Sequence, residues 1–449
     1  MKNYALALLI LCSKSAFSQV DFSVPWAMFH ACEKHCGMYP SKNYTSFGST
    51  KWKFSTKGKI FSSPAVFEGV AYIGSEDKNL YAVDIATGKE LWKFTTEGAI
   101  HSSPAVYKDV VYFGSFDGFY YALNKNTGKL RWKFQTGGEK LNGHKGLWGM
   151  KPDNEFLNDP FDFYLSSPVI NMDDTNLKVY FGSSDGNLYS LDAETGKLSW
   201  KFKTNGIIHT SPTLYEGKVF IGSWDTYMYA VDAEAGKEIW KFKTGDHPEV
   251  HLLEGIQASA TVDVDEDAIY FGARDAYFYA LDINTGNLKW KFFNDNSWVL
   301  STAGVKDGSI YFGTSDQYNL ISLDAKTGKQ NWKFKANGYV YSSPALAGNT
   351  VFFGDFTGKM FALDLKSGMQ TDVFTTQGRN KNADTVLNLD HIDFPHITKG
   401  LDPSLYATTT VAMNKLYSLG SILSSPVVNN GVLYFGSADG SLYALNLKN

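Results

Sequence analysis

The chain has 449 residues, a formal net charge of −4 and 15% aromatic residues. This length is enough to bury a large core, and the nearly balanced charge gives no support for a nucleic-acid partner. No apolar run in the sequence is long enough to cross a bilayer as a helix, so no transmembrane segment is expected.

Residues 1–18 have the pattern of a secretory signal peptide. Lys2 supplies positive charge, residues 5–12 form a short apolar core, and residues 16–18 (AFS) resemble a small-residue cleavage site. We therefore expect an exported protein, periplasmic or extracellular. A lipid anchor on Cys12 is an alternative, but Leu11 stands where such a site needs a small residue.

Residues 19–46 form an N-terminal extension with the two cysteines that remain after removal of the leader, Cys32 and Cys36. In an oxidising compartment we expect these two to form a disulfide. The neighbouring His30 and His35 make a metal site the alternative. However, the stretch HACEKHC lacks the paired Cys-x-x-Cys units of a strong metal motif, so no metal is assigned.

A repeat of about forty residues fills the chain from residue 47 onward. Its clearest copy, residues 102–134, contains four short apolar runs separated by Gly, Asp, Asn and Lys, which is typical of a four-stranded antiparallel meander. A glycine in a Gly-Ser-x-Asp-Gly-like turn marks each copy: Gly74, Gly114, Gly182, Gly222, Gly272, Gly313, Gly354 and Gly436. Eight such units predict an all-β fold, a single eight-bladed β-propeller spanning residues 47–449.

Most copies also carry the phrase Ala-x-Asp-x-x-Thr-Gly-x-x-x-Trp or a close variant of it. The Thr-Gly pair suits a tight turn between the third and fourth strands, and we expect the Trp ring to pack against the next blade. The phrase resembles the tryptophan-docking motif of the PQQ-type, or quinoprotein-like, β-propellers, over roughly residues 47–449. That group includes quinoprotein alcohol dehydrogenases and the propeller subunit of the outer-membrane β-barrel assembly machinery. The motif is specific for the fold, but the fold serves several unrelated functions.

The two ends of the repeat array complement each other. The seventh copy has Asp372 in the Trp position, and the eighth stops near Asn446 without a fourth strand. Residues 47–54 (FGSTKWKF) match that missing strand, because Gly48 precedes Trp52 by four residues as in the complete copies. We predict that this N-terminal strand joins the C-terminal blade and closes the ring, which removes the exposed edges of an open array.

Three links between blades are much longer than the others, at about residues 135–163, 243–256 and 375–420. Each follows a fourth strand, so all three should lie on the face of the Gly-Ser-x-Asp-Gly turns. Long loops of this kind usually carry function. They contribute the candidate binding residues His144, Trp148, His247, His251, His391 and His396.

The repeat loses its regularity in the fourth to sixth copies. There Trp224, Arg274 and Trp298 stand where other copies have smaller or neutral residues. Since the other copies serve as an internal reference, departures in neighbouring blades favour a ligand or partner site. Packing against the long links is an equally good interpretation.

These features favour a secreted or periplasmic scaffold that binds an unidentified protein, glycan or small ligand on the face with the long links. The resemblance implies an alternative, a PQQ-dependent oxidoreductase with PQQ and calcium over the channel. Such enzymes have adjacent cysteines above the quinone, a stacking Trp and Glu, Asn and Asp metal ligands, whereas this chain has no adjacent Cys pair and no haem motif. A polysaccharide lyase or hydrolase is a second alternative, which would need a His, Tyr or paired-carboxylate centre. No catalytic residue is assigned.

Overall fold

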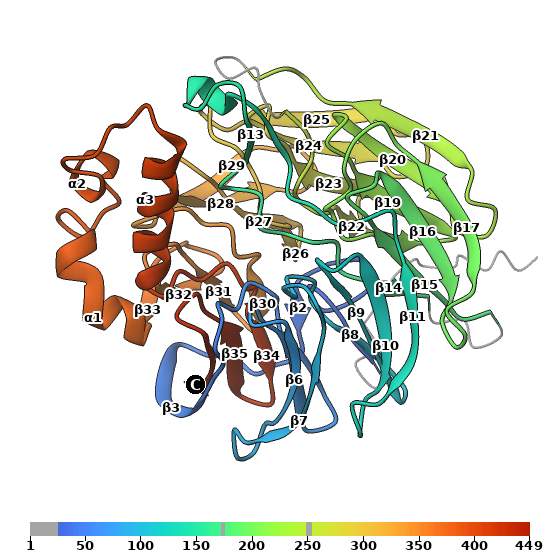
Figure 1. Ribbon diagram of the computed structural model, residues 1–449, viewed down its shortest axis with the longest axis horizontal. Coiled ribbons are helices and arrows are strands. Elements are labelled where there is room, and N and C mark those ends of the chain that lie inside the picture. Colours follow the sequence, from blue (N-terminus) through green and yellow to red (C-terminus); the bar gives the residue numbers. More distant parts are fainter. Residues whose placement is uncertain (1–25, 172–175, 248–253) are drawn as a thin grey trace, which may run out of the picture.

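The computed structural model describes residues 26–171, 176–247 and 254–449. The predicted signal peptide, Cys12 and His251 lie outside these ranges. Eight antiparallel sheets, each built around four strands that are consecutive in space, are arranged around an axis (Figure 1). The predicted eight-bladed propeller is confirmed.

The strands of blades 1 to 4 are β4 (Ala65–Phe67), β5 (Val70–Gly74), β6 (Asn79–Asp84) and β7 (Glu90–Thr95); β8 (Ala105–Tyr107), β9 (Val110–Ser115), β10 (Phe119–Asn124) and β11 (Leu130–Gln135); β14 (Val169–Ile170), β15 (Lys178–Gly182), β16 (Asn187–Asp192) and β17 (Leu198–Lys203); β18 (Thr213–Tyr215), β19 (Lys218–Gly222), β20 (Tyr227–Asp232) and β21 (Glu238–Lys243). Those of blades 5 to 8 are β22 (Thr261–Asp263), β23 (Ala268–Gly272), β24 (Tyr277–Asp282) and β25 (Leu288–Phe293); β26 (Gly304–Lys306), β27 (Ser309–Gly313), β28 (Asn319–Asp324) and β29 (Gln330–Lys335); β30 (Ala345–Ala347), β31 (Thr350–Gly354), β32 (Lys359–Asp364) and β33 (Gln370–Thr375); β34 (Val427–Asn429), β35 (Val432–Gly436), β36 (Ser441–Lys448) and the N-terminal β3 (Ser46–Ser55).

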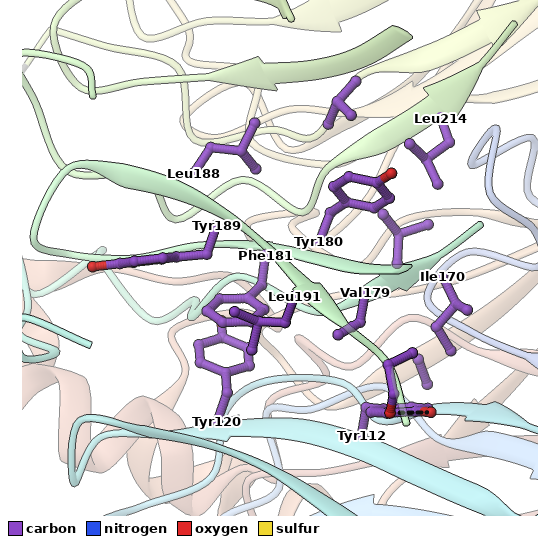
Figure 2. Packing of buried hydrophobic residues seen from close by; sticks show 14 of the residues in the cluster. Tyr112, Tyr120, Ile170, Val179, Tyr180, Phe181, Leu188, Tyr189, Leu191 and Leu214 are labelled. Atoms are coloured by element: carbon purple, nitrogen blue, oxygen red, sulfur yellow. Dashed lines mark hydrogen bonds between the residues drawn. The ribbon is translucent and has the colours of Figure 1, made fainter. Parts of the chain in front are cut away.

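The core lies between the blades. The middle strands of each blade are buried on both faces, because both pack against a neighbouring blade. Figure 2 shows such a junction between blades 2 and 3, where the rings of Tyr120 and Phe181 stack with centroids 3.5 Å apart. The Tyr120 hydroxyl donates to the Ser166 carbonyl at 2.6 Å, so its buried oxygen is satisfied.

The motif tryptophans lock each blade to the next. The Trp52 indole N–H donates to the Ile85 carbonyl at 2.8 Å, and its ring lies beneath Gly88. Gly88 has a φ of +70°, and a Cβ there would come within 2.7 Å of the Trp52 ring, so only glycine fits. The same arrangement recurs at Trp92, Trp132, Trp200, Trp240, Trp290 and Trp332.

The ring closes through the N-terminal strand, as predicted. β3 pairs antiparallel with β36, with Trp52 opposite Ala444. At the junction of blades 7 and 8, where Asp372 replaces the tryptophan, its carboxylate accepts a hydrogen bond of 2.8 Å from the backbone N–H of Phe47. The Phe47 ring packs against Phe352, with centroids 5.7 Å apart. This junction is therefore held by a different lock, made by the chain's own N-terminal strand.

A ring of hydroxyl side chains surrounds the channel. At seven junctions the backbone N–H of one blade's Ser or Thr donates to the Ser Oγ of the next, at 2.8–3.1 Å. The bond from Ser425 to Ser63 spans the closure between the last blade and the first. The ring consists of Ser63, Ser103, Ser167, Ser211, Ser259, Thr302, Ser343 and Ser425.

Residues 27–39, which we call the N-terminal clamp, cross the channel end below this ring. Two short strands, β1 (Trp26–Ala27) and β2 (Met38–Tyr39), pair with β8 and β30. Between them, clamp carbonyls accept backbone hydrogen bonds of 2.8–3.0 Å from the inner strands of blades 4 to 7: Glu33 from Leu214, Lys34 from Val262, Cys36 from Val305 and Gly37 from Leu346. The clamp therefore ties five blades together.

The clamp buries all four side chains of the candidate disulfide or metal stretch. The Sγ atoms of Cys32 and Cys36 lie 3.0 Å apart as free thiols, so their pairing stays a prediction. His30 Nε2 bonds to the Pro344 carbonyl at 3.0 Å, and His35 Nδ1 bonds to the Ala260 carbonyl at 3.2 Å. Backbone groups thus engage the imidazoles.

Acid should loosen this clamp. Burial lowers the pKa of His30 to about 4 and that of His35 to about 3, below the ordinary value of 6.5. Because the unfolded residues bind protons more readily, the stability that the neutral imidazoles contribute above pH 6.5 is lost as the pH falls toward 4. We expect hydrogen exchange, corrected for intrinsic rates, to show less protection of the Leu214 and Val262 amides at pH 5 than at pH 7.5. The Ser103 amide is the control, and equal losses there would contradict the expectation.

The long links contain the remaining elements. The first holds the hairpin β12 (Gly143–Lys145) and β13 (Phe156–Asn158) with the single turn η1 (Leu147–Gly149). The third holds helices α1 (Gln377–Val386), α2 (Phe394–Ile397) and α3 (Tyr406–Ser418), which group at one side of the propeller (Figure 1, left). No helix of the described chain has the length and apolar character needed to cross a membrane.

Candidate functional site at the channel mouth

The mouth of the channel is polar on one side and apolar on the other. One residue per blade stands two positions before the residue of the hydroxyl ring. These residues are Phe61, His101, Leu165, His209, Gln257, Leu300, Tyr341 and Leu423. The polar ones hold the first long link: His101 Nδ1 bonds to the Phe163 carbonyl at 2.5 Å, His209 Nδ1 to Asp162 Oδ1 at 2.8 Å, and Gln257 Nε2 to the Phe161 carbonyl at 3.0 Å. This link therefore plugs the polar side.

Arg274 anchors the same link from blade 5. Its side chain is enclosed, with 1% exposed, and Nη1 lies 2.6 Å from Asp159 Oδ2. The guanidinium carbon lies 4.4 Å from the ring centroid of Trp224 and 4.3 Å from that of Trp298, so the charge stacks between two indoles. Gln257 Oε1 accepts two further hydrogen bonds, from Nε at 3.1 Å and Nη2 at 2.7 Å. Burial raises the pKa of Asp159, and the Arg274 charge opposes that rise.

Ser184, His209 and Asp162 form a chain that superficially matches a hydrolase triad. His209 Nε2 lies 2.8 Å from Ser184 Oγ, and the Ser184 hydroxyl donates to the Lys140 carbonyl at 2.9 Å. Burial alone would lower the pKa of His209, but the Asp162 charge and hydrogen bond raise it overall. All three side chains are buried, and the axial cavity beneath them measures about 30 Å³, enough for about one water. The chain ties the link to blades 3 and 4 and offers no place for a substrate.

The third long link covers the apolar side of the mouth. Phe163 packs against Phe61, with centroids 5.9 Å apart, and against Tyr417 of α3 at 6.2 Å. Leu416 and Met413 of α3 are buried in the same cluster. Hydrophobic contact therefore fastens α3 where polar anchors are missing.

The first and third links interlock into one unit, which we call the insert platform (residues 139–163 and 377–419). Lys151 donates from its backbone N–H to the Ser404 carbonyl at 2.8 Å, and its own carbonyl accepts from the Tyr406 N–H at 2.9 Å. The Tyr406 hydroxyl donates to the Asn158 carbonyl at 2.8 Å. Large apolar side chains remain exposed on it: Phe156 (57%), Leu389 (88%), Leu401 (44%), Leu405 (39%) and Val411 (40%).

The structure brings some of the predicted site residues together. Trp224, Arg274, Trp298 and Trp148 form one group, in which the Trp148 and Trp298 centroids are 6.1 Å apart. This group packs against the first long link, so the packing interpretation accounts for the irregular sector. A binding role for these residues stays a prediction.

The predicted histidines do not join that group. His144 on β12 is exposed, and its Nδ1 bonds to the Lys145 carbonyl at 2.7 Å. His391 and His396 are exposed on the third link, whereas His247 is buried with Nε2 3.3 Å from the Asn296 carbonyl. Within the described ranges, no group of three or more His, Cys, Asp or Glu side chains is placed to hold a metal ion.

The mouth does not fit PQQ with calcium. Side chains of the first long link occupy the axis, where Phe161 packs against Trp298 at 6.3 Å and against Tyr339 at 5.6 Å. The two cysteines lie in the clamp, at the opposite end of the channel from this mouth. The cavity on the axis is far smaller than a quinone cofactor.

Comparison of the sequence with known protein families shows to which family the chain belongs. Residues 45–146, 146–291 and 229–393 match the family described as outer membrane protein assembly factor BamB. The chain belongs to this family. No curated protein matches it in sequence.

Solved structures share the fold with this BamB-family chain. BamB from Moraxella catarrhalis is 18% identical, with a TM-score of 0.61 over 89% of this chain and 98% of its own. A europium-containing methanol dehydrogenase is 14% identical, with a TM-score of 0.67 over 94% and 98%. The quinohemoprotein alcohol dehydrogenase of Comamonas testosteroni is 13% identical, with a TM-score of 0.65 over 93% and 80%. At these identities the likeness concerns the fold alone.

Proposed function

We propose that this BamB-family protein is an exported scaffold that holds another protein on the insert platform. The exposed apolar side chains of the platform carry the proposal. Phe156, Leu405 and Val411 stay exposed although the platform buries other apolar residues against the mouth. Several large apolar side chains left exposed on one inserted unit favour an interaction surface there. Export rests on the leader pattern and on the family description.

The platform is also well suited to bind without rearrangement. Arg274, His209 and Gln257 fix the first link, and α3 is fixed by its buried face. A surface held in place in this way loses little conformational entropy on association. Catalysis has no comparable support, because the buried Ser184–His209–Asp162 chain has no access for a substrate.

Site-specific crosslinking in cells tests the proposal. A photo-reactive benzoylphenylalanine at Phe156 is expected to yield an adduct of one defined mass, whose second protein is identified by mass spectrometry. Leu198, which is 41% exposed on the outer strand of blade 3, is the matched control and should yield none. Equal adducts at both positions, or none at either, would contradict a partner on the platform.

A further inference from the structure

A hollow, which we call the rim hollow, lies between the outer parts of blades 6 and 7. It measures about 590 Å³, within the size range of small-ligand pockets. Its walls include the turn between β26 and β27 and the turn between β32 and β33, so it opens on the face opposite the insert platform. Tyr311, Trp332 and the buried Leu365 supply its apolar surface. Its polar side chains come from both blades: Asp307, Ser309, Asn331, Asn349, Asp364 and Lys366.

Two other junctions bridge the equivalent space with a pair of side chains. Between blades 1 and 2 the Glu68 carboxylate pairs with the Lys125 ammonium. Between blades 3 and 4 the Asn176 amide donates to the Glu234 carboxylate at 2.9 Å. Each bridge joins the turn after the first strand of one blade to the turn after the third strand of the next, and thereby closes the groove between the blades.

In two further blades the residue before the motif tryptophan covers this space. Arg131 of blade 2 pairs with Asp109, and the Lys289 ammonium of blade 5 donates to the Asp267 carbonyl at 3.2 Å. Both long side chains therefore fold over the first turn of their own blade.

Blade 6 lacks both kinds of cover. Asn331 stands before its motif tryptophan, and Nδ2 of this shorter side chain donates to the buried Ser322 Oγ at 3.2 Å. Asp307 and Lys366 occupy the two positions that are bonded to each other between blades 3 and 4. Within the described chain, no hydrogen bond or ion pair joins these two side chains, so the space between the blades stays open.

Several polar groups in the rim hollow are available to a ligand. The Asp307 carboxylate, the Asn331 Oδ1 atom and the Asn349 side chain make no hydrogen bond to any residue that the structure describes, and all three residues are exposed. Burial raises the pKa of Tyr311, and the negative charge of Asp307 adds to the rise, so this carboxylate lies near the phenol.

The turn after the third strand of blade 7 carries a balanced pair of charges. The Asp364 carboxylate accepts from the Ser367 backbone N–H at 2.8 Å and from its hydroxyl at 2.7 Å. These bonds lower the pKa of Asp364, and the Lys366 charge lowers it further. Asp364 is therefore ionised beside a cation, and the hollow carries little net charge apart from that of Asp307.

This combination of groups suits a sugar. A sugar hydroxyl both donates and accepts hydrogen bonds, and the exposed amides of Asn331 and Asn349 offer donors and acceptors. The apolar face of a sugar ring packs on aromatic surface, which Tyr311 and Trp332 provide with ring centroids 5.8 Å apart. The unpaired Asp307 would repel a phosphate, and the anchor of a protein partner needs a more apolar, fully desolvated centre.

We propose that the rim hollow binds an oligosaccharide. Asp307, Asn331 and Asn349 bond to its hydroxyl groups, and the Tyr311–Trp332 pair supports one sugar ring. The site is independent of the proposed scaffold function, because it lies on the opposite face from the insert platform. With both surfaces occupied, the protein connects a glycan on one face to a protein on the other.

Calorimetry on the full-length mature protein tests the site. The probes are cellotriose, maltotriose and triacetylchitotriose, with sorbitol as an open-chain polyol and trialanine as a small peptide. At least one trisaccharide is expected to bind saturably with a Kd below about 1 mM, whereas sorbitol and trialanine should not bind.

Two arginine variants locate the binding. Asn331→Arg introduces the residue that covers the equivalent space in blade 2, and it should weaken binding at least tenfold. Ser199→Arg, the same replacement before the motif tryptophan of blade 3, should leave binding unchanged. Asn349→Ala, which removes an exposed amide without filling the hollow, should weaken binding severalfold.

The proposal is overturned if no trisaccharide binds, or if sorbitol or trialanine binds as tightly as the sugars. Equal effects of Asn331→Arg and Ser199→Arg also overturn it, because the binding would then lie elsewhere. The crosslink from Phe156 reports on the scaffold alone and is expected to be the same in Asn331→Arg. Failure of the sugar site and failure of the scaffold are therefore seen in different measurements.

Discussion

Replacing Asp159 with alanine should destabilise the protein by about 3–5 kcal/mol, because the Arg274 charge would remain buried without its partner. The guanidinium is enclosed by Trp224 and Trp298, so it has no route to water. Urea denaturation followed by tryptophan fluorescence measures the loss. Phe156→Ala, in the same link but on an exposed side chain, is the control and should change stability by less than about 1 kcal/mol.

The double replacement Asp159→Leu with Arg274→Met separates the effect of the buried charge from that of lost packing. Removing both charges leaves apolar groups of similar size, so most of the lost stability should return. The coupling between the two sites is obtained from the wild type, Asp159→Leu, Arg274→Met and the double variant. If the single and double variants are equally unstable, packing rather than charge holds the link, and the ion pair is not its anchor.

The second large effect concerns ring closure. A chain that begins at Thr45 lacks the clamp but keeps β3, whereas a chain that begins at Lys57 lacks both. We expect the first to fold and the second to lose cooperative unfolding. Without β3 the last blade has no outer strand. The loss of the Trp52 side chain, which packs on blade 1, would alone lower the free energy of unfolding by about 3–5 kcal/mol. Thermal unfolding by calorimetry compares the two, and matching melting temperatures would show that closure contributes nothing.

The sequence predicted the propeller well because every blade repeats the same physical solution. Seven tryptophans at one position of the repeat could only be inter-blade locks, and the gap at the eighth copy pointed to the N-terminal strand. The substitute lock could not be foreseen. Nothing in the repeat pairs Asp372 with the backbone of Phe47, which lies 325 positions earlier.

Of the residues at the channel mouth, only those that belong to the repeated blades could be identified from the sequence. Trp224, Arg274 and Trp298 stand out against the other copies, and His209 and Gln257 could have been found by the same comparison two positions before the residue of the hydroxyl ring. Their partners lie in a link without periodicity, so no pattern indicated that Asp159 meets Arg274. The helices of the third link could not be predicted either, because that link also lacks a repeated pattern.

The pairing of β3 with β36 also sets the order in which the molecule is made. Residues 46–55 are synthesised before the other strands of the eight blades, whereas their partner strand, residues 441–448, is synthesised after them. Contacts between such distant segments form slowly, since a very long loop must be closed first. Until then the first and last blades present unpaired strand edges, which favour aggregation. Completion of this ring is therefore a late step in biogenesis, and the interval before it is when a nascent chain most needs a chaperone.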